Sequence, residues 1–122
     1  MIGIASIRQA GALTYQMRQG GLWLLMVQSK TTHRWIFPKG NLEPGVSAPE
    51  SASFEAFEEA GVLGTIETRS IGSYSYRKQI ENGGDLCRVR LYPMEVTHVL
   101  SAYPEKGVRA RQWMTLEQGL EA

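Results

Sequence analysis

The segment from Ser47 to Gly61 restricts the fold most strongly, because it carries both a start signal and a stop signal for one helix. Ser47 and Glu50 form the S-x-x-E capping pattern, in which each side chain accepts a hydrogen bond from the other residue's backbone N–H. Pro49 suits the first helical turn, and Gly61 suits the left-handed conformation that commonly ends a helix. We therefore predict a helix that Ser47 caps and that runs through Ala60.

Strand-like segments lie on both sides of this helix. Before it, residues 11–17 and 22–28 enclose the turn-like residues 18–21, which predicts a β-hairpin. Apolar and alternating patterns predict further strands at residues 65–73, 74–78, 86–97 and 109–114, with a hairpin turn at 81–84, and residues 35–37 form a short apolar run that Pro38 breaks.

The remaining segments complete a mixed α/β pattern. Residues 40–45 hold two glycines and a proline, so we expect a loop there. Residues 115–118 repeat the capping box and predict a terminal helix. Strands combined with one central and one terminal helix indicate an α/β domain.

Length and composition indicate a single globular domain over residues 1–122. Apolar residues make up 43% and charged residues 20%, a balance typical of folded chains. The 13 basic and 12 acidic residues nearly cancel, so we expect no nucleic-acid partner. The apolar run at 21–27 is too short to cross a bilayer and no signal segment is recognised, so we expect no membrane partner. The single cysteine, Cys87, excludes an internal disulfide and fits a cytoplasmic location.

Glu55, Glu58 and Glu59 lie on one face of the predicted helix, because residues three and four apart share a side. Like charges in this arrangement repel, and no lysine or arginine occurs between Lys39 and Arg69 to offset them. Clustered carboxylate oxygens suit a hard divalent cation such as Mg²⁺ or Mn²⁺. A solvated acidic surface is the alternative interpretation of this face.

The segment Pro38-Lys39-Gly40, which precedes the helix, favours the metal interpretation. It brings a lysine, flexible backbone and free carbonyl groups next to the acidic face. Acidic groups for a metal ion and a basic group for phosphate oxygens are the two halves of phosphoryl chemistry. We expect Lys39 to bind phosphate, with a solvated turn lysine as the alternative.

Residues 40–62 resemble the Nudix box, whose pattern is G-x5-E-x7-R-E-U-x-E-E-x-G-U, with U aliphatic. Gly40, the three glutamates and the closing Gly61-Val62 fall at the required spacing. Two positions depart, because Val46 stands where the pattern has its first glutamate and Phe54 where it has arginine. The resemblance implies that this arginine orients the box glutamates by charge-assisted hydrogen bonds, so its loss bears on catalytic efficiency.

Segments beyond the box, at residues 35–40, 59–64 and 109–113, resemble the diphosphoinositol polyphosphate phosphohydrolase branch of this family. The resemblance implies an α/β/α sandwich with a mixed central β-sheet. It also implies Mg²⁺- or Mn²⁺-dependent hydrolysis of a diphosphate linkage, X–P–P–Y, in which water attacks phosphorus. Dinucleoside polyphosphates and diphosphoinositol polyphosphates are the favoured small-molecule substrates. The alternative is a module of the same fold that senses a nucleotide or phosphorylated metabolite, and a homodimer is left open.

The resemblance also implies roles for individual residues. Glu55 and Glu59 are expected to share the metal ion, with the carbonyl oxygen of Gly40 as a further ligand. Glu58 is either a third metal ligand or the group that activates water, so Glu58 and Glu59 are the candidate catalytic residues. Glu105 is interpreted as an exposed loop residue in preference to a contributor to this site.

Arginines outside the box are candidate phosphate ligands. Arg34 lies just before the box, and Arg109 and Arg111 share one face of a predicted strand, so we expect these three residues to bind substrate. Arg88 and Arg90 also share a strand face, where a solvated surface explains them as well as polyphosphate binding does.

Overall fold

The computed structural model of the chain describes residues 6–78 and 84–121. Its elements, in chain order, are β1 (Ser6–Arg18), β2 (Gly21–Gln28), β3 (Trp35–Ile36), β4 (Lys39–Asn41), α1 (Ala48–Glu55), the π-helical segment η1 (Ala56–Ala60), β5 (Val62–Ile66), β6 (Gly72–Arg77), β7 (Leu86–Val99), β8 (Arg111–Thr115) and α2 (Leu116–Glu121). In the described residues, no helix is long and apolar enough to span a membrane.

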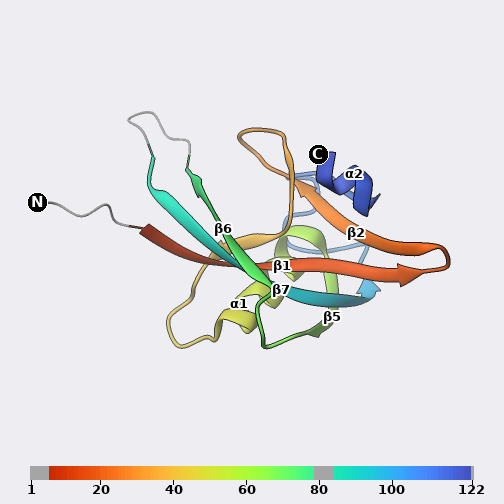
Figure 1. The fold of residues 1–122 in the computed structure, drawn as a ribbon, viewed down its shortest axis with the longest axis horizontal. Coiled ribbons are helices and arrows are strands. Elements are labelled where there is room, and N and C mark those ends of the chain that lie inside the picture. Colours follow the sequence, from red (N-terminus) through yellow and green to blue (C-terminus); the bar gives the residue numbers. More distant parts are fainter. Residues whose placement is uncertain (1–5, 79–83, 122) are drawn as a thin grey trace, which may run out of the picture.

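A mixed sheet forms the centre of the molecule (Figure 1). Its strand order is β3-β2-β1-β7-β5, with β1 and β7 parallel and the other neighbours antiparallel. Strands β4, β6 and β8 pair outside this path with β1, β7 and β2. The long strands β1 and β7 therefore organise the sheet, and the predicted hairpin between residues 11 and 28 is confirmed as β1–β2.

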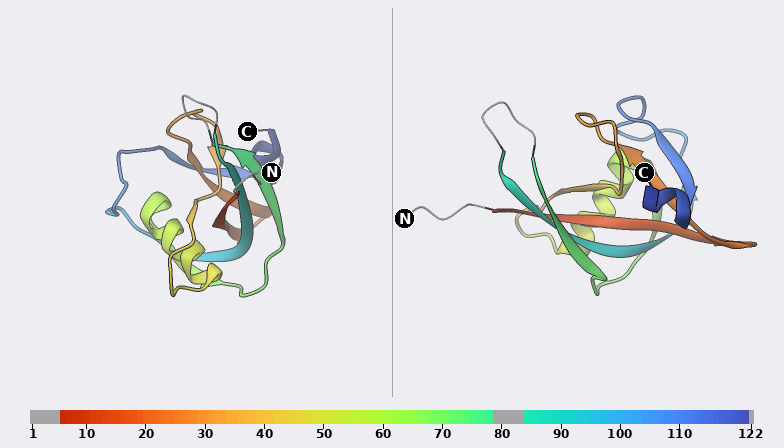
Figure 2. Two further views of the ribbon diagram at one scale, coloured as in Figure 1. Left: turned by 90° about the vertical axis from the view of Figure 1, so that its left-hand side faces the viewer. Right: turned by 45° about the horizontal axis from the view of Figure 1, so that its top comes forward.

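The helical segment formed by α1 and η1 packs against one face of the sheet, as the left view of Figure 2 shows. Small side chains line this contact, because Ala10 and Ala12 of β1 and Ala52, Ala56 and Ala60 of the helical segment are all fully buried. Alanine side chains let a helix backbone approach a sheet closely at the packing density of a protein interior.

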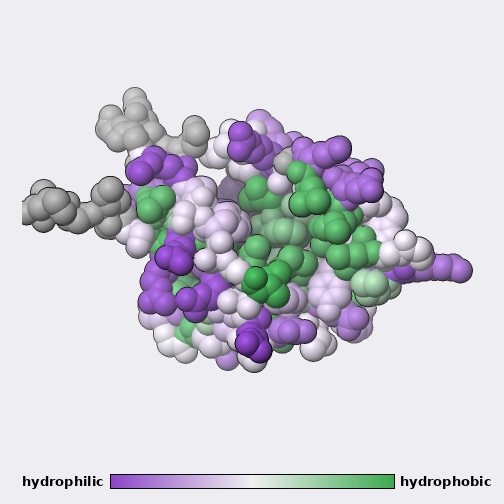
Figure 3. Space-filling view, viewed as in Figure 1, coloured by the Kyte–Doolittle hydropathy of each residue, from purple (hydrophilic) through white to green (hydrophobic). Residues whose placement is uncertain are grey.

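A second apolar cluster covers the opposite face, where hydrophobic side chains gather over β1 and β2 (Figure 3). Leu24, Met26 and Met114 are buried there, and the terminal helix α2 packs against β2 and β8. The sheet thus has helices on both sides, which confirms the predicted α/β/α class with a mixed central sheet.

The helix begins and ends as its caps predict. The Oγ atom of Ser47 accepts a hydrogen bond from the backbone N–H of Glu50 at 3.3 Å, and Gly61 adopts the left-handed conformation with φ of 66°. The last five residues, 56–60, differ from the prediction because they form a π-helical segment, in which the N–H of Gly61 bonds back to the carbonyl of Ala56. Such wide turns occur mainly as single insertions within α-helices, frequently at functional sites.

Two predicted segments differ in conformation or extent from the structure. Residues 39–41 form β4 through antiparallel pairing with β1, although residues 40–45 were expected to be a loop. Three residues are too few to show strand periodicity, so only the pairing partner decides their conformation. The predicted strand at 65–73 is instead β5, which ends at Ile66, and a connection that meets β7 through the backbone N–H groups of Glu67 and Ile71.

The other elements form where the sequence predicts them but with shifted bounds, because β1 begins earlier, at Ser6, and β8 begins later, at Arg111. Strands β6 and β7 pair antiparallel, although residues 81–83 of the predicted turn between them lie outside the described residues. The terminal capping box is confirmed, because Thr115 N–H donates to Gln118 Oε1 at 2.9 Å and Gln118 N–H donates to Thr115 Oγ1 at 3.2 Å.

Candidate active site

The box glycine and the first box carboxylate lie in direct contact. A Cβ atom on Gly40 would overlap the carboxylate group of Glu55, so any larger residue there would have to displace that carboxylate. Gly40 is in β4, which Ala10 of β1 holds in place by pairing, and Glu55 is the last residue of α1. Helix and strand thereby bring carboxylate oxygens against the backbone of a glycine.

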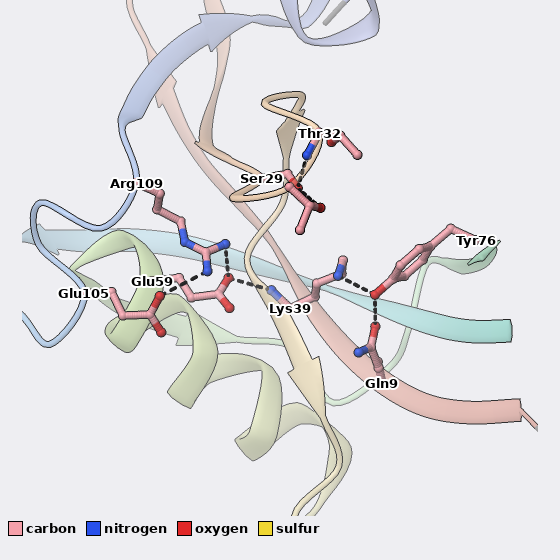
Figure 4. Close-up of polar contacts among 9 residues, drawn as sticks. Gln9, Ser29, Thr32, Lys39, Glu59, Tyr76, Glu105 and Arg109 are labelled. Carbon is pink, nitrogen blue, oxygen red and sulfur yellow. Dashed lines mark hydrogen bonds and ion pairs between the residues drawn. The ribbon is translucent and has the colours of Figure 1, made fainter. Parts of the chain in front are cut away.

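Glu59 points from η1 toward the same strand (Figure 4). Its side chain is nearly buried, and its Oε1 atom accepts a hydrogen bond from the backbone N–H of Lys39 at 3.1 Å. The same oxygen lies 3.8 Å from Nη1 of Arg109, whose side chain is 9% exposed. One hydrogen bond and one ion pair, from distant parts of the chain, therefore meet at one oxygen of this carboxylate.

The two carboxyl groups are electrostatically coupled. Burial raises the pKa of Glu55 from 4.5 to about 8, with further increases from the negative charges of Glu59 and Glu58. Burial also raises the pKa of Glu59, while Arg109 and the N–H of Lys39 oppose the increase. The neighbouring box glutamates thus act on Glu55, whereas the further increase at Glu59 comes from the negative charge of Glu105, and a cation beside these groups would relieve both effects.

Glu105 also belongs to this site, which corrects its interpretation as an exposed loop residue. Its side chain is 26% exposed, and its Oε1 atom accepts a hydrogen bond from Nη2 of Arg109 at 3.1 Å. Its backbone N–H donates to the carbonyl of Glu58 at 3.0 Å, so the loop before β8 is attached to η1. Residue spacing does not predict this contact, because Glu105 lies in a turn far from the box.

The donor set fits a hard divalent cation. Among residues 6–78 and 84–121, no three His, Cys, Asp or Glu side chains form a complete metal-binding group. The carboxylates of Glu55 and Glu59, beside the backbone of Gly40, would supply oxygen ligands, with water or substrate in the remaining positions. Mg²⁺ typically binds in this way, through one or two carboxylates with several retained waters.

Lys39 contributes its backbone to the carboxylates and its side chain to a separate polar network (Figure 4). Its Nζ atom donates to the hydroxyl of Tyr76 at 2.6 Å and lies 4.3 Å from the centre of that ring. The hydroxyl donates to Gln9 Oε1 at 2.8 Å, and Gln9 Nε2 donates to Asn41 Oδ1 at 2.8 Å. Burial lowers the pKa of Lys39. Sequence reasoning missed Tyr76, Gln9 and Asn41, which the strand pairing brings together.

Arg111 is engaged by the protein backbone. Its Nη1 and Nη2 atoms donate to the carbonyls of Ala60 and Leu100, each at 2.7 Å, and its guanidinium group lies over the ring of Tyr103 at 4.6 Å. A Cβ atom on Gly61 would overlap the same ring. Arg111 therefore links the end of η1 to the segment before β8. Arg109 contacts carboxylates. Both guanidinium groups that were expected to bind phosphate thus have partners within the protein.

A groove of about 680 Å³ opens beside Arg109, between the β2–β3 connection and the segment before β8. Its lining is Gln28, Ser29, Lys30, His33, Tyr103 and residues 107–111. Arg34 is exposed on the same connection but is not part of this lining. The lining of the groove thus includes basic side chains and no carboxylate.

The two departures from the box lie at the surface. Val46 is 39% exposed and Phe54 is 51% exposed. The ring of Phe54 packs at a tilt against that of Phe57, with 6.4 Å between centroids. Neither position supplies a charge to the carboxylates, whereas Arg109 does so from outside the box.

Comparison with known proteins agrees with this geometry. A family model described as NUDIX domain matches residues 6–122. "Nudix hydrolase 12, mitochondrial" of Arabidopsis thaliana is 36% identical over 104 residues, which cover 82% of this chain and 51% of that protein. "Diphosphoinositol polyphosphate phosphohydrolase 3-beta" of Bos taurus is 28% identical over 116 residues, covering 93% of this chain and 67% of that protein.

Solved structures share the fold. The C. elegans Ap4A hydrolase in a binary complex superposes with a TM-score of 0.72 at 22% identity, covering 94% of this chain and 84% of that one. The chain spans about half the length of the Arabidopsis relatives it matches. The match over nearly the whole chain, the mixed sheet and the box carboxylates gathered at Gly40 show that this chain belongs to the Nudix family.

Proposed function

We propose that this domain catalyses Mg²⁺-dependent hydrolysis of a diphosphate linkage in a nucleoside- or inositol-linked polyphosphate. The observation that carries the proposal is the pair of interacting carboxyl groups, Glu55 against the backbone of Gly40 and Glu59 bonded to the N–H of Lys39 beside it. Excess negative charge in a partly buried place is costly unless a cation offsets it. The relatives named as hydrolases support the same reaction class.

Each residue has a distinct task in this proposal. Glu55, Glu59 and the carbonyl of Gly40 would hold the metal, which supplies Lewis-acid activation of phosphate and a lowered pKa for water. Glu59 suits a fixed ligand, because Lys39 and Arg109 hold its Oε1 atom. The side chain of Glu58 is half-buried and suits the proton acceptor for the attacking water, a role worth about 10²–10⁴-fold in rate.

The charge around the groove supports a phosphate-rich substrate. Lys30 and His33 border it on one side, and Arg109, which contacts the carboxylates, borders it on the other. A substrate that places its scissile phosphate at the carboxylates can extend its distal phosphates past Arg109 toward Lys30 on the far side of the groove. Dinucleoside polyphosphates and diphosphoinositol polyphosphates have the required length and charge.

A module that senses such a compound without cleaving it is the second candidate. The specific observation in its favour is that Phe54 and Val46 are exposed apolar residues at two charged positions of the box. The intact carboxylate pair at Gly40 favours the enzyme.

Chromatographic separation of the two phosphorylated products from a panel of diphosphate compounds, with and without Mg²⁺, tests the proposal. We expect turnover that requires the metal and that Glu59→Gln abolishes, while Glu67→Gln, at an exposed glutamate after β5, retains it. Tight binding of one compound without turnover of any would establish the sensor instead. Full activity of Glu59→Gln would refute the metal assignment.

A further inference from the structure

Arg109 is the most enclosed charged group beside the candidate metal site. Its guanidinium group lies between two carboxylates, with Nη1 3.8 Å from Glu59 and Nη2 3.1 Å from Glu105, and its side chain is 9% exposed. Both ion pairs found in the described residues involve this arginine. A buried charge is stable only when its partners are well placed, so the three side chains form one interdependent unit.

The route by which Arg109 reaches Glu59 is also fixed. Glu105 is tied to η1 through its backbone hydrogen bond to Glu58, and the N–H of Val108 donates to the carbonyl of Glu105 at 3.0 Å. This turn brings the guanidinium group against η1, whereas Phe54, which precedes Glu55 in the helix, is an exposed aromatic residue. The cation that contacts a box carboxylate therefore comes from the segment before β8 rather than from the helix.

The contacts select one oxygen of Glu59. Both Arg109 and the N–H of Lys39 engage Oε1. The hydrogen bond from Lys39 and the ion pair with Arg109 therefore restrict the rotation of this carboxylate, which lies beside Glu55. Charge-assisted contacts of this kind fix orientation as well as adding energy.

We infer that Arg109 is a positioning residue that holds Glu59 in the orientation needed to bind a divalent metal. The inference rests on the proposed metal-dependent function and reassigns Arg109 from substrate phosphates to the carboxylates. Arg109 is then needed for metal affinity itself, before any substrate binds.

Titration of the metal-free protein with Mn²⁺ alone tests this inference, with free Mn²⁺ followed by electron paramagnetic resonance at a temperature where every variant is folded. We expect Arg109→Gln to bind Mn²⁺ about 10- to 100-fold more weakly, the range typical for loss of a partner that orients a metal ligand. Arg109→Lys should recover part of the affinity, because it restores the charge without the planar fork.

Arg111→Gln is the matched control, because Arg111 comes from the same segment but bonds only to backbone carbonyls and Tyr103. It should lower the melting temperature without changing Mn²⁺ affinity. Unchanged or tighter Mn²⁺ binding by Arg109→Gln, or equal weakening by Arg111→Gln, would overturn the inference. If Arg109→Gln does not fold, Mn²⁺ binding by Arg109→Lys becomes the test. Wild-type Mn²⁺ affinity in Arg109→Lys would then overturn the inference. Metal binding by the natural protein without turnover of any compound would refute the proposed function alone.

Discussion

Replacement of Gly40 by alanine tests the central contact of the site. The added Cβ would overlap the carboxylate of Glu55, so one of the two must move. β4 cannot withdraw, because Gly40 pairs with Ala10 of β1, which is fully buried. We therefore expect the flexible end of Glu55 to move and the fold to survive.

The expected magnitudes separate stability from function. Overpacking a core costs typically about 1–3 kcal/mol, and a flexible side-chain end places this change near 1 kcal/mol. With an unfolding entropy of about 2.1 cal/mol/K per residue over 122 residues, the melting temperature should fall by about 4 °C. A displacement of about 1 Å in a reacting group can cost about 10²-fold in rate, so turnover should fall far more than stability.

Differential scanning calorimetry measures the melting temperature, and Mg²⁺-dependent hydrolysis of the diphosphate compound measures turnover, both on one preparation. Gly119→Ala is the control, because Gly119 lies in α2, remote from the carboxylates, and its added methyl group meets only the flexible side chain of Leu24. Gly40→Ala with natural metal affinity and turnover would refute the argument that Gly40 and Glu55 form the metal site.

Three further predictions concern stability. The pKa of Glu55 is raised from 4.5 to about 8 in the folded protein, so its stabilising contribution is complete below pH 4.5 and is lost as the pH rises toward 8. In EDTA, the urea midpoint should be lower at pH 8.5 than at pH 5.5, and Glu55→Gln should reduce the difference; an unchanged difference would exclude Glu55 as the cause. Tyr76→Phe removes the partner of Lys39 Nζ and Gln9 Oε1 and should cost about 1–3 kcal/mol in urea unfolding, unless water replaces the hydroxyl, in which case the midpoint stays constant. Ser47→Ala removes the helix cap and should cost about 1 kcal/mol, whereas Ser47→Asp should not; equal losses in both would show that the cap is not the cause.

The sequence determined those features that depend on neighbours within one helical turn. Ser47 caps the helix three residues from its partner Glu50, and Gly61 ends it in the left-handed conformation. The spacing of Glu55 and Glu59 places both on one helix side, and Gly40 completes the box pattern. These signals are local, because caps and side-chain spacing act within a few residues and need no knowledge of the rest of the fold.

The π-helical segment and the short strand β4 depended on packing that the sequence pattern does not contain. Residues 39–41 become a strand only because β1 lies beside them. The loop prediction is therefore wrong only at residues 40–41, where the long-range pairing with β1 outweighs one glycine, and residues 42–45 remain outside any strand or helix.

Only the tertiary structure decided which distant side chains serve the site. In the sheet, Tyr76 pairs with Cys87 of β7, and Cys87 pairs with Ile7 of β1. This register brings the hydroxyl group of Tyr76 to Gln9, 67 positions away in the sequence. Arg109 reaches Glu59 in the same way, through a turn that Glu105 fastens to η1. Neither Tyr76 nor Arg109 stands at a regular spacing from the box in the sequence. Strand register and loop attachment, rather than local conformation, set these contacts.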